Sequence, residues 1–337
     1  MESTPLFSVL CVCWNEGAFL AEGIRSVLRQ SESSLELILV DDHSTDTTWE
    51  IMSAAAKEDP RVVILRNPTK GKVAGFNAAV ALSKGQWIHL LGGDDMLAPT
   101  CLEACRKVID SSGPDLSGVY HDYTILNKET GEEVRATPYG PWLEKASLTQ
   151  VWQKKCVIGG GFFAIRGNYA RTILWPQPLN WKSEDHSIAA VLKGLGEIRY
   201  LSQSLYEYRM LPGHYAFNPT LETHIRGVAE YSQGLRLFKE RSISWATLPT
   251  EAQAEAEKHF RHSDFITDSS RSLYQALQSR IGVKRFAMLL LIRWLPSSFP
   301  ISSSVHRYIS GIQMRIGLIL KNLRKSTPQQ CINHSVN

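Results

Sequence analysis

The sequence predicts an α/β fold with a doubly wound, mostly parallel sheet, and two observations support this prediction. Over the first hundred residues, short apolar runs of strand length alternate with stretches of helical spacing. Two of the predicted strands end in adjacent aspartates, Asp41-Asp42 and Asp94-Asp95. Ligands of open α/β sheets bind outside the carboxyl ends of the strands, so both acidic pairs lie where a ligand site is expected.

The elements of this first half follow from hydrophobic spacing. Nearly continuous apolar runs predict strands buried on both faces, at 7–14, 35–40, 61–66 and 87–91. Apolar residues at helical spacing predict amphipathic helices between the strands, at 18–30, 47–57 and 71–83. Ser44 or Thr45 is expected to cap the second helix, with Asp46 favourable in its first turn.

Beyond residue 105 the pattern changes. Helices are expected at 101–111, 142–152 and 187–193, and strands at 118–126 and 198–206. A further strand follows three consecutive glycines at 159–161. These glycines indicate either backbone close to a ligand or a loop that bends sharply.

Length and charge divide the chain into two parts. Its 337 residues are enough for one large domain or two. Asp268 is the last acidic residue, and ten basic residues follow it, so residues 1–268 carry a net charge of −6 and the remainder +10. We therefore expect a mildly acidic body with a basic tail.

The cysteines and the N-terminus indicate a cytoplasmic location. None of the six cysteines belongs to a Cys-x-x-Cys motif, and we expect reduced, buried thiols rather than disulfides or a zinc site. The N-terminus has no basic segment leading into a long apolar run, which argues against a signal peptide. A stretch of about 18 uninterrupted apolar residues is also missing, which argues against a spanning helix.

The turns after the first and fourth strands decide which ligand chemistry is expected. The first turn, Trp14-Asn15-Glu16-Gly17, lacks the glycine pattern of dinucleotide sites, and no P-loop motif is present, which disfavours dehydrogenases and P-loop NTPases. Asp94 and Asp95 repel each other, so they suit a divalent cation that bridges substrate phosphates. The alternative is a solvated turn, because Gly-Asp-Asp is ordinary turn chemistry.

Four motifs together resemble glycosyltransferase family 2, the inverting GT-A nucleotide-sugar transferases. They lie at 8–16, 40–45, 71–77 and 91–99. Three departures accompany the match. Val12-Cys13-Trp14 stands where Pro-Thr-Tyr is usual, Gly92 replaces the first acid of the metal motif, and Phe76 replaces an arginine.

The resemblance continues into the second half of the chain. Glu184-Asp185 before a helix, and Tyr208-Arg209 at the end of a strand, are similar to the layout of the family's acceptor half. The resemblance implies that Asp185, with Glu184 beside it, takes the proton from the acceptor hydroxyl. The alternative is that the two acids only favour the helix N-terminus.

The resemblance also implies a donor site. Asp95 would hold Mg²⁺ or Mn²⁺ on the diphosphate, with His214 assisting at the metal or the phosphate. Asp94 would contact the ribose or sugar, and Lys72 or Arg209 the phosphates. The remaining residues expected to bind the nucleotide sugar are Trp14, by stacking on the base, Glu16, Asp42 and Asn77.

We therefore expect a GT-A catalytic domain at 1–217, with a Rossmann-like nucleotide-sugar half at 1–105 and an acceptor half at 106–217. The expected activity is inverting transfer from a nucleotide-diphosphate sugar, a UDP-sugar being favoured, to a hydroxyl of a glycan or lipid-linked glycan in cell-surface polysaccharide biosynthesis. The alternative is a non-catalytic sugar-nucleotide-binding or scaffold protein of the same fold. A nucleotidyltransferase is disfavoured because the glycine-rich basic first loop is missing.

Residues 218–337 are expected to form a helical, basic extension. Within it, 281–325 reads as acid-free amphipathic helices that suit an anionic membrane surface. The protein would then lie peripherally on the inner face of the cytoplasmic membrane. A packed helical subdomain with a solvated basic face is the alternative, and the apolar content argues against a nucleic-acid partner.

Overall fold

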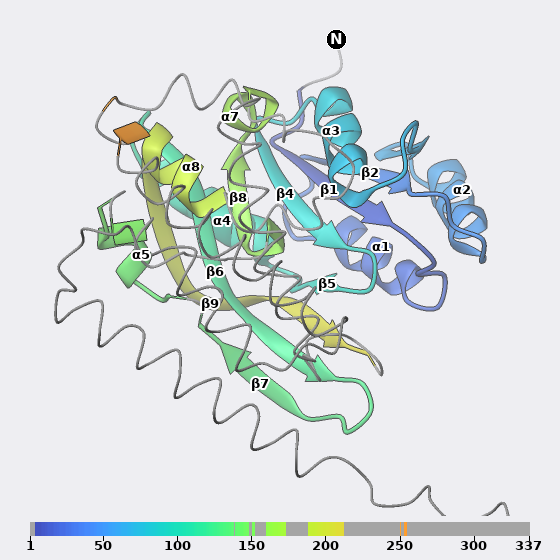
Figure 1. Ribbon diagram of the computed structural model, residues 1–337. Helices are drawn as coiled ribbons and strands as arrows, with labels where there is room; N and C mark the ends of the chain where they lie inside the picture. Colours follow the sequence, from blue (N-terminus) through green and yellow to red (C-terminus); the bar gives the residue numbers. More distant parts are fainter. Residues whose placement is uncertain are drawn as a thin grey trace, which may run out of the picture. The chain divides into compact units, whose positions relative to one another are not determined.

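A computed structural model of the protein describes residues 4–137, 139–147, 150–151, 160–172, 188–211, 250 and 253–254. The chain divides into two units, Met1–Gln275 and Ala276–Asn337, and the second unit lies outside the described residues. The described part of the first unit is a mixed α/β structure around one large sheet (Figure 1).

The first half alternates strands and helices as the sequence predicts. Its elements are β1 (Phe7–Cys13), α1 (Leu20–Leu28), β2 (Leu35–Asp41), α2 (Thr48–Glu58), β3 (Val62–Arg66), α3 (Lys72–Leu82) and β4 (Trp87–Gly92). The four strands are parallel in the order β3-β2-β1-β4. Strands β1 and β2 are buried along their whole length, because helices flank a parallel sheet on both faces.

The second half extends the same sheet. Its elements are β5 (Met96–Leu97), α4 (Cys101–Ser111), β6 (Leu116–Asn127), β7 (Glu133–Ala136), α5 (Trp142–Lys145), the 3₁₀ turn η1 (Gly160–Phe162), β8 (Phe163–Arg166), α7 (Gly167–Thr172), α8 (Ile188–Leu195) and β9 (Glu197–Met210). The order continues β4-β8-β6-β9-β5, and β8 is antiparallel to both of its neighbours. Strands β6 and β9 run together as the long parallel pair of Figure 1, with β7 along β6. The expected doubly wound, mostly parallel sheet is confirmed.

Helix α3 lies close to the centre of the sheet because of a glycine. It packs against β1 and β2. A Cβ placed on Gly75 would lie 2.7 Å from Val12 Cγ1, so no larger residue fits at this distance between helix and strand. The small-residue helix predicted from the sequence therefore sits directly behind the carboxyl end of β1.

Two local expectations were wrong. The predicted helix at 142–152 stops at Lys145, because Ser147 and Gln150 form a capping box that starts a new turn: Ser147 N–H donates to Gln150 Oε1 (2.8 Å) and Gln150 N–H to Ser147 Oγ (3.2 Å). Neither Ser44 nor Thr45 caps α2. The N-cap of α2 is Thr47, without a side-chain capping hydrogen bond, while Asp46 Oδ1 accepts from Thr48 N–H at 3.0 Å. Ser44 Oγ accepts from Asn15 N–H instead.

The expected helical extension at 218–337, including 281–325, lies outside the described residues apart from 250 and 253–254, which are helical. Within the part of the chain that is described, no helix is long and apolar enough to cross a membrane.

Candidate functional site

Three parallel strands bring acidic residues to one edge of the sheet. Strand β1 lies between β2 and β4, and the three end at corresponding positions. The turns that follow carry Glu16 after β1, Asp42 after β2, and Asp94 and Asp95 after β4. The sequence expectation that these side chains share the carboxyl edge of the sheet is therefore met by the strand order.

Asp95 is held in place by strand β9. Its side chain is 4% exposed, its Oδ1 accepts from the backbone N–H of Arg209 (2.8 Å), and its Oδ2 accepts from the Tyr206 hydroxyl (2.6 Å). The Tyr206 oxygen in turn accepts from the backbone N–H of Gly92 at 3.0 Å. Tyr206 was not among the residues expected from the sequence, since its partner Asp95 lies 111 residues away in the chain.

Gly92 leaves room for both aspartates. A Cβ on Gly92 would lie 2.5 Å from Asp95 Oδ2 and 3.1 Å from Asp94 Oδ1. An aspartate at position 92, as in the family motif that the sequence resembles, would not fit with Asp95 turned toward Tyr206. The orientation of Asp95 toward Tyr206 therefore depends on the glycine at position 92.

Glu16 contributes a third carboxylate whose environment is unfavourable for its charge. Its Oε2 atom is buried with no hydrogen-bond partner and packs against Gly93, where a Cβ would lie only 1.6 Å from that oxygen. Burial, together with the negative charges of Asp94 and Asp95, raises the pKa of Glu16 to about 8, while Lys72 opposes the shift.

Asp95 shows the same imbalance of charge. Burial and the neighbouring Asp94 raise the pKa of Asp95 to about 7, although the hydrogen bonds from Tyr206 and Arg209 and the charge of Lys72 act in the opposite direction. The ionised forms of Glu16 and Asp95 are therefore disfavoured at this place in the fold. Hard divalent cations bind such oxygens, with substrate phosphates supplying the rest of the ligand set. Glu16, Asp94 and Asp95 are therefore candidate metal ligands, although their oxygens do not all lie within 4.8 Å of one another.

Asp42 organises the loop that leads into α3. Its Oδ1 accepts from the side-chain amide of Asn67 (2.7 Å) and from the backbone N–H of Gly71 (2.8 Å), and its own N–H donates to the Cys13 carbonyl (2.8 Å). Gly71 has a φ of 133°, a conformation that favours glycine. By holding Gly71, Asp42 also positions Lys72, which follows Gly71 in the chain. The contact of Asp42 with the nucleotide stays a prediction.

Trp14 presents an aromatic face at the end of β1. The side chain is 55% exposed, and Lys70 Nζ lies 5.5 Å from its ring centroid. The left-handed φ of 56° at Asn15 turns the chain immediately after it. An exposed ring beside the carboxylate edge suits base stacking, which stays a prediction.

Helix α3 carries Lys72, Phe76 and Asn77. Lys72 is exposed, with Nζ 5.7 Å from the Phe76 ring centroid, and Asn77 is half-buried. Phe76 is 2% exposed and belongs to the core. The position where the resemblance leads one to expect an arginine is therefore filled by a packing residue, and the positive charge near the carboxylates comes from Lys72.

Arg209 turns its guanidinium away from Asp95. The side chain is 2% exposed, Nη2 donates to Glu22 Oε2 (2.5 Å), Nε donates to Glu207 Oε1 (3.0 Å), and Nη1 is buried without a partner. While the guanidinium keeps these two carboxylates, only Nη1 is left to donate to a phosphate. The phosphate role of Arg209 stays a prediction, whereas its backbone N–H supports Asp95 directly.

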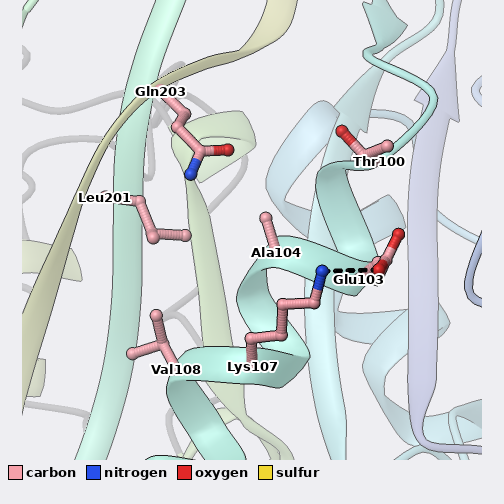
Figure 2. Close-up of a pocket in the computed structure, with 7 residues that line it drawn as sticks. All are labelled: Thr100, Glu103, Ala104, Lys107, Val108, Leu201 and Gln203. Carbon is pink, nitrogen blue, oxygen red and sulfur yellow. Dashed lines mark ion pairs between the residues drawn. The ribbon is translucent and has the colours of Figure 1, made fainter.

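Glu184, Asp185 and His214 lie outside the described residues, so the predicted base and the assisting histidine are not located. A separate hollow lies between α4 and β9, away from the carboxylates, and Figure 2 shows its lining by Thr100, Glu103, Ala104, Lys107, Val108, Leu201 and Gln203. Lys107 and Glu103 form an ion pair across one helical turn there (2.6 Å). Because Asp94, Asp95 and Glu16 do not line this hollow, it is not part of the candidate site.

Residues 8–172 match the family model described as Glycosyl transferase family 2, and this part of the chain is a family 2 glycosyltransferase domain. An uncharacterized glycosyltransferase of Nostoc sp. is 26% identical over 208 residues, covering 60% of this chain and 64% of the relative. The chain spans less than two thirds of the length of the first curated relatives that it matches.

Two solved structures are similar to the whole fold. The mannosyltransferase PcManGT of Pyrobaculum calidifontis, solved with GDP-Man and Mn²⁺, has a TM-score of 0.55 at 16% identity, covering 97% of this chain and 89% of that one. Residues 1–349 of S. aureus TarS, solved with UDP-GlcNAc, have a TM-score of 0.51 at 15% identity, covering 81% and 91%. The fold is thus that of GT-A glycosyltransferases.

Proposed function

We propose that this protein is an inverting glycosyltransferase that transfers a sugar from a nucleotide-diphosphate sugar to the hydroxyl of a glycan or lipid-linked glycan. The observation that carries the proposal is the cluster of Glu16, Asp94 and Asp95 at the carboxyl edge of a family 2 domain. The nucleotide sugars GDP-Man and UDP-GlcNAc, bound by the two similar structures, support a donor of this class.

The diphosphate of the donor would be bound at the cluster of carboxylates. A divalent cation, Mn²⁺ or Mg²⁺, held by Asp94, Asp95 and Glu16 would offset the charge that develops on the leaving diphosphate. Lys72 adds positive charge on the α3 side of the same cluster. Tyr206 and the Arg209 backbone keep Asp95 oriented before the donor arrives, so no reorganisation is needed at that position.

The exposed ring of Trp14 would stack on the nucleotide base, with Asp42 and Asn77 next to it. In the acceptor half, Asp185, flanked by Glu184, would accept the proton of the attacking hydroxyl, as the resemblance implies. Inversion follows because the deprotonated hydroxyl attacks the anomeric carbon from the face opposite the diphosphate.

The thermal stability of the full chain with nucleotides tests the donor site. UDP, GDP, CDP and dTDP would each be added with and without Mn²⁺, because a ligand that binds only the folded state raises the unfolding temperature. We expect one nucleotide, UDP being the first choice, to stabilise the protein only with metal, and the effect to vanish in Asp94→Asn and Asp95→Asn. Asp110→Asn, an exposed aspartate on α4, is the matched control that should keep the shift.

Activity separates an enzyme from a non-catalytic protein of the same fold. We expect Asp185→Asn to retain the nucleotide-dependent shift but to lose turnover of the nucleotide sugar. If the protein is well folded and none of the four nucleotides changes its unfolding temperature, the donor site is overturned. A protein that binds nucleotide but turns over no sugar in the wild type would favour a scaffold role.

A further inference from the structure

A second polar cluster lies in the core, away from the carboxylate edge. It consists of His89 on β4, Cys101 at the start of α4 and His121 on β6, all three with no exposed surface. The two Nε2 atoms are 3.3 Å apart, and Cys101 Sγ lies 3.7 Å from one and 3.8 Å from the other. Within the described residues this is the group of histidine, cysteine and acidic side chains whose ligand atoms converge closely enough for one metal ion.

The hydrogen bonds of the two imidazoles determine where their protons lie. His89 Nδ1 is 2.9 Å from the Leu90 carbonyl oxygen, and His121 Nδ1 is 2.9 Å from that of Asp122. A carbonyl oxygen can only accept, so each Nδ1 carries the hydrogen. Both Nε2 atoms then turn lone pairs toward each other, with no proton between them.

Neutral imidazoles are also what burial favours at this position. Burial, with His121 nearby, lowers the pKa of His89 to about 3, and burial lowers the pKa of His121 to about 4. Lone pairs of three atoms, two imidazole nitrogens and one sulfur, therefore converge on one point in the core.

The spacing matches a tetrahedral metal site. With Zn–N distances of about 2.05 Å and Zn–S distances of about 2.3 Å, two nitrogens of a tetrahedron lie about 3.3 Å apart, and a nitrogen and a sulfur about 3.6 Å apart. The observed distances are 3.3 Å between the nitrogens and 3.7 and 3.8 Å to the sulfur. The planes of the two rings differ by only 10°, with centroids 5.6 Å apart.

We propose that His89, Cys101 and His121 bind a structural zinc ion, with Cys105 as the fourth ligand. Cys105 lies one turn further along the same face of α4 and is fully buried, but its thiol lies outside the converging group of His89, Cys101 and His121, so it would have to turn toward the ion to complete the four ligands. Two thiolates and two neutral imidazoles make the zinc site uncharged, which matters because an uncompensated buried charge is costly. Each thiol releases its proton to solvent on binding, and no electron is transferred.

The site would have the supports that zinc sites need. Histidine ligands are commonly oriented by a hydrogen bond from the other ring nitrogen, and the Leu90 and Asp122 carbonyls provide one for each imidazole. The ion would cross-link β4, β6 and α4, thereby joining the half of the domain that carries Asp94 and Asp95 to the half that carries β9. It would act on stability, not on the transfer step.

This proposal departs from the expectation, drawn from the sequence, that the cysteines do not form a zinc site. Cys101 and Cys105 are separated by three residues, and the two histidines stand twelve residues before and twenty after Cys101. No familiar zinc spacing results. Only the insertion of β8 between β4 and β6, with α4 packed against the sheet, brings the four side chains together.

Cobalt substitution of the full chain tests the proposal. After removal of metal with a chelator, added Co²⁺ should produce a thiolate-to-cobalt charge-transfer band and the strong visible absorption of a tetrahedral ion. Zn²⁺ should displace the cobalt at about one equivalent and raise the unfolding temperature by several degrees. The double variant Cys101→Ala, Cys105→Ala should lose the charge-transfer band, whereas Cys11→Ala, which removes another fully buried thiol on β1, should keep it.

The donor site also binds divalent ions in our proposal, so the two sites are distinguished by their ligands. Oxygen ligands give no thiolate band, and Asp94→Asn should therefore leave the cobalt spectrum unchanged. A folded wild-type protein that shows no thiolate band and retains no zinc would overturn the metal site and leave a hydrogen-bonded trio. A band that survives in the double variant Cys101→Ala, Cys105→Ala would equally overturn it, whatever the nucleotide experiments show.

Discussion

The Tyr206 hydroxyl links strand β9 to the turn after β4, which carries Asp95. It donates to Asp95 Oδ2 at 2.6 Å and accepts from Gly92 N–H at 3.0 Å. Gly161 packs flat against this ring, since a Cβ there would lie 2.7 Å from it. The orientation of Asp95 thus depends on Tyr206, which lies on β9.

Replacing Tyr206 by phenylalanine should therefore disturb Asp95 without opening a cavity. The buried Gly92 N–H and an Asp95 oxygen lose their partner, which we expect to lower the free energy of unfolding by about 1–3 kcal/mol. Loss of the donated hydrogen bond should also raise the pKa of Asp95, so that Mn²⁺ binding weakens most at pH 6–7. Urea unfolding and metal titration at several pH values would measure both effects.

Tyr123→Phe is the control for this substitution. Tyr123 belongs to the same aromatic group, with its ring 3.9 Å from that of Phe162, but it does not contact Asp95. A Tyr206→Phe protein with wild-type stability and an unchanged pH dependence of metal binding would show that Asp95 is held by other contacts.

Glu16 makes the stability of the metal-free protein depend on pH. Its native pKa of about 8 lies above its ordinary value of 4.5, so between these values the native state binds more protons than the unfolded state. The free energy of unfolding must then fall as the pH rises, by up to about 1.4 kcal/mol per pH unit for one group. Glu16→Gln should flatten this decline, measured by urea unfolding with chelator present.

Glu58→Gln, an exposed glutamate at the end of α2, should keep the wild-type slope. Mn²⁺ should reverse the effect in the wild type, because a cation favours the ionised carboxylate. An identical pH dependence in wild type and Glu16→Gln would mean that Glu16 does not carry the shifted proton.

At the scale of elements, the approach of α3 to β1 determines where Lys72 lies. Gly75 is the contact point, and Asp42 holds the loop before the helix through Asn67 and Gly71. The helix therefore has little freedom to move away from the sheet. Its first residue is placed beside the carboxylates by packing behind it, not by contacts of Lys72 alone.

Gly75→Ala should push α3 outward, because the new Cβ would lie 2.7 Å from Val12. We expect a loss of about 1–3 kcal/mol in the free energy of unfolding, as for other overpacked positions. The nucleotide-dependent rise in unfolding temperature should also shrink. Gly113→Ala, where no atom lies within 4 Å of the added Cβ, should change stability by less than about 0.5 kcal/mol. Equal effects of the two substitutions would contradict the close packing.

At the scale of the whole molecule, charge is distributed unevenly along the chain. The acidic body contains the described domain, and ten basic residues follow Asp268 without any acid. A lipid-linked acceptor would lie at a membrane surface, and a basic, apolar-rich tail is suited to reach it. Membrane association stays a prediction from the sequence.

The full chain should sediment with vesicles that contain an anionic lipid and remain in solution with neutral ones. Added salt should weaken the binding, since surface charges are screened over about 10 Å at 0.1 M ionic strength. The double variant Lys284→Glu, Arg285→Glu should bind less, while Lys57→Glu, Lys84→Glu on the exposed surface of the domain should bind as the wild type does. Binding unaffected by the tail substitutions would assign any membrane contact to another surface.

The sequence by itself determined the features that depend on neighbouring residues. Apolar runs and helical spacing predicted the alternation that leads through Asp42 to Asp94 and Asp95, and the carboxyl-edge rule placed these acids in one site. The family resemblance rests on the same local motifs. Periodicity is readable because it repeats within ten or fifteen residues. The predicted helix at 142–152 was wrong because a local signal, the Ser147–Gln150 capping box, was overlooked.

Only the tertiary structure decided which distant side chains meet. Tyr206 and Asp95 are 111 residues apart, Arg209 and Glu22 are 187 apart, and His89 and His121 lie on strands with β8 between them in the sheet. Strand order and crossovers place such partners together, and these are set by how the whole sheet buries its two faces. No pattern within a window of the sequence contains that information, so the orientation of Asp95 and the histidine–cysteine cluster emerged only from the folded chain.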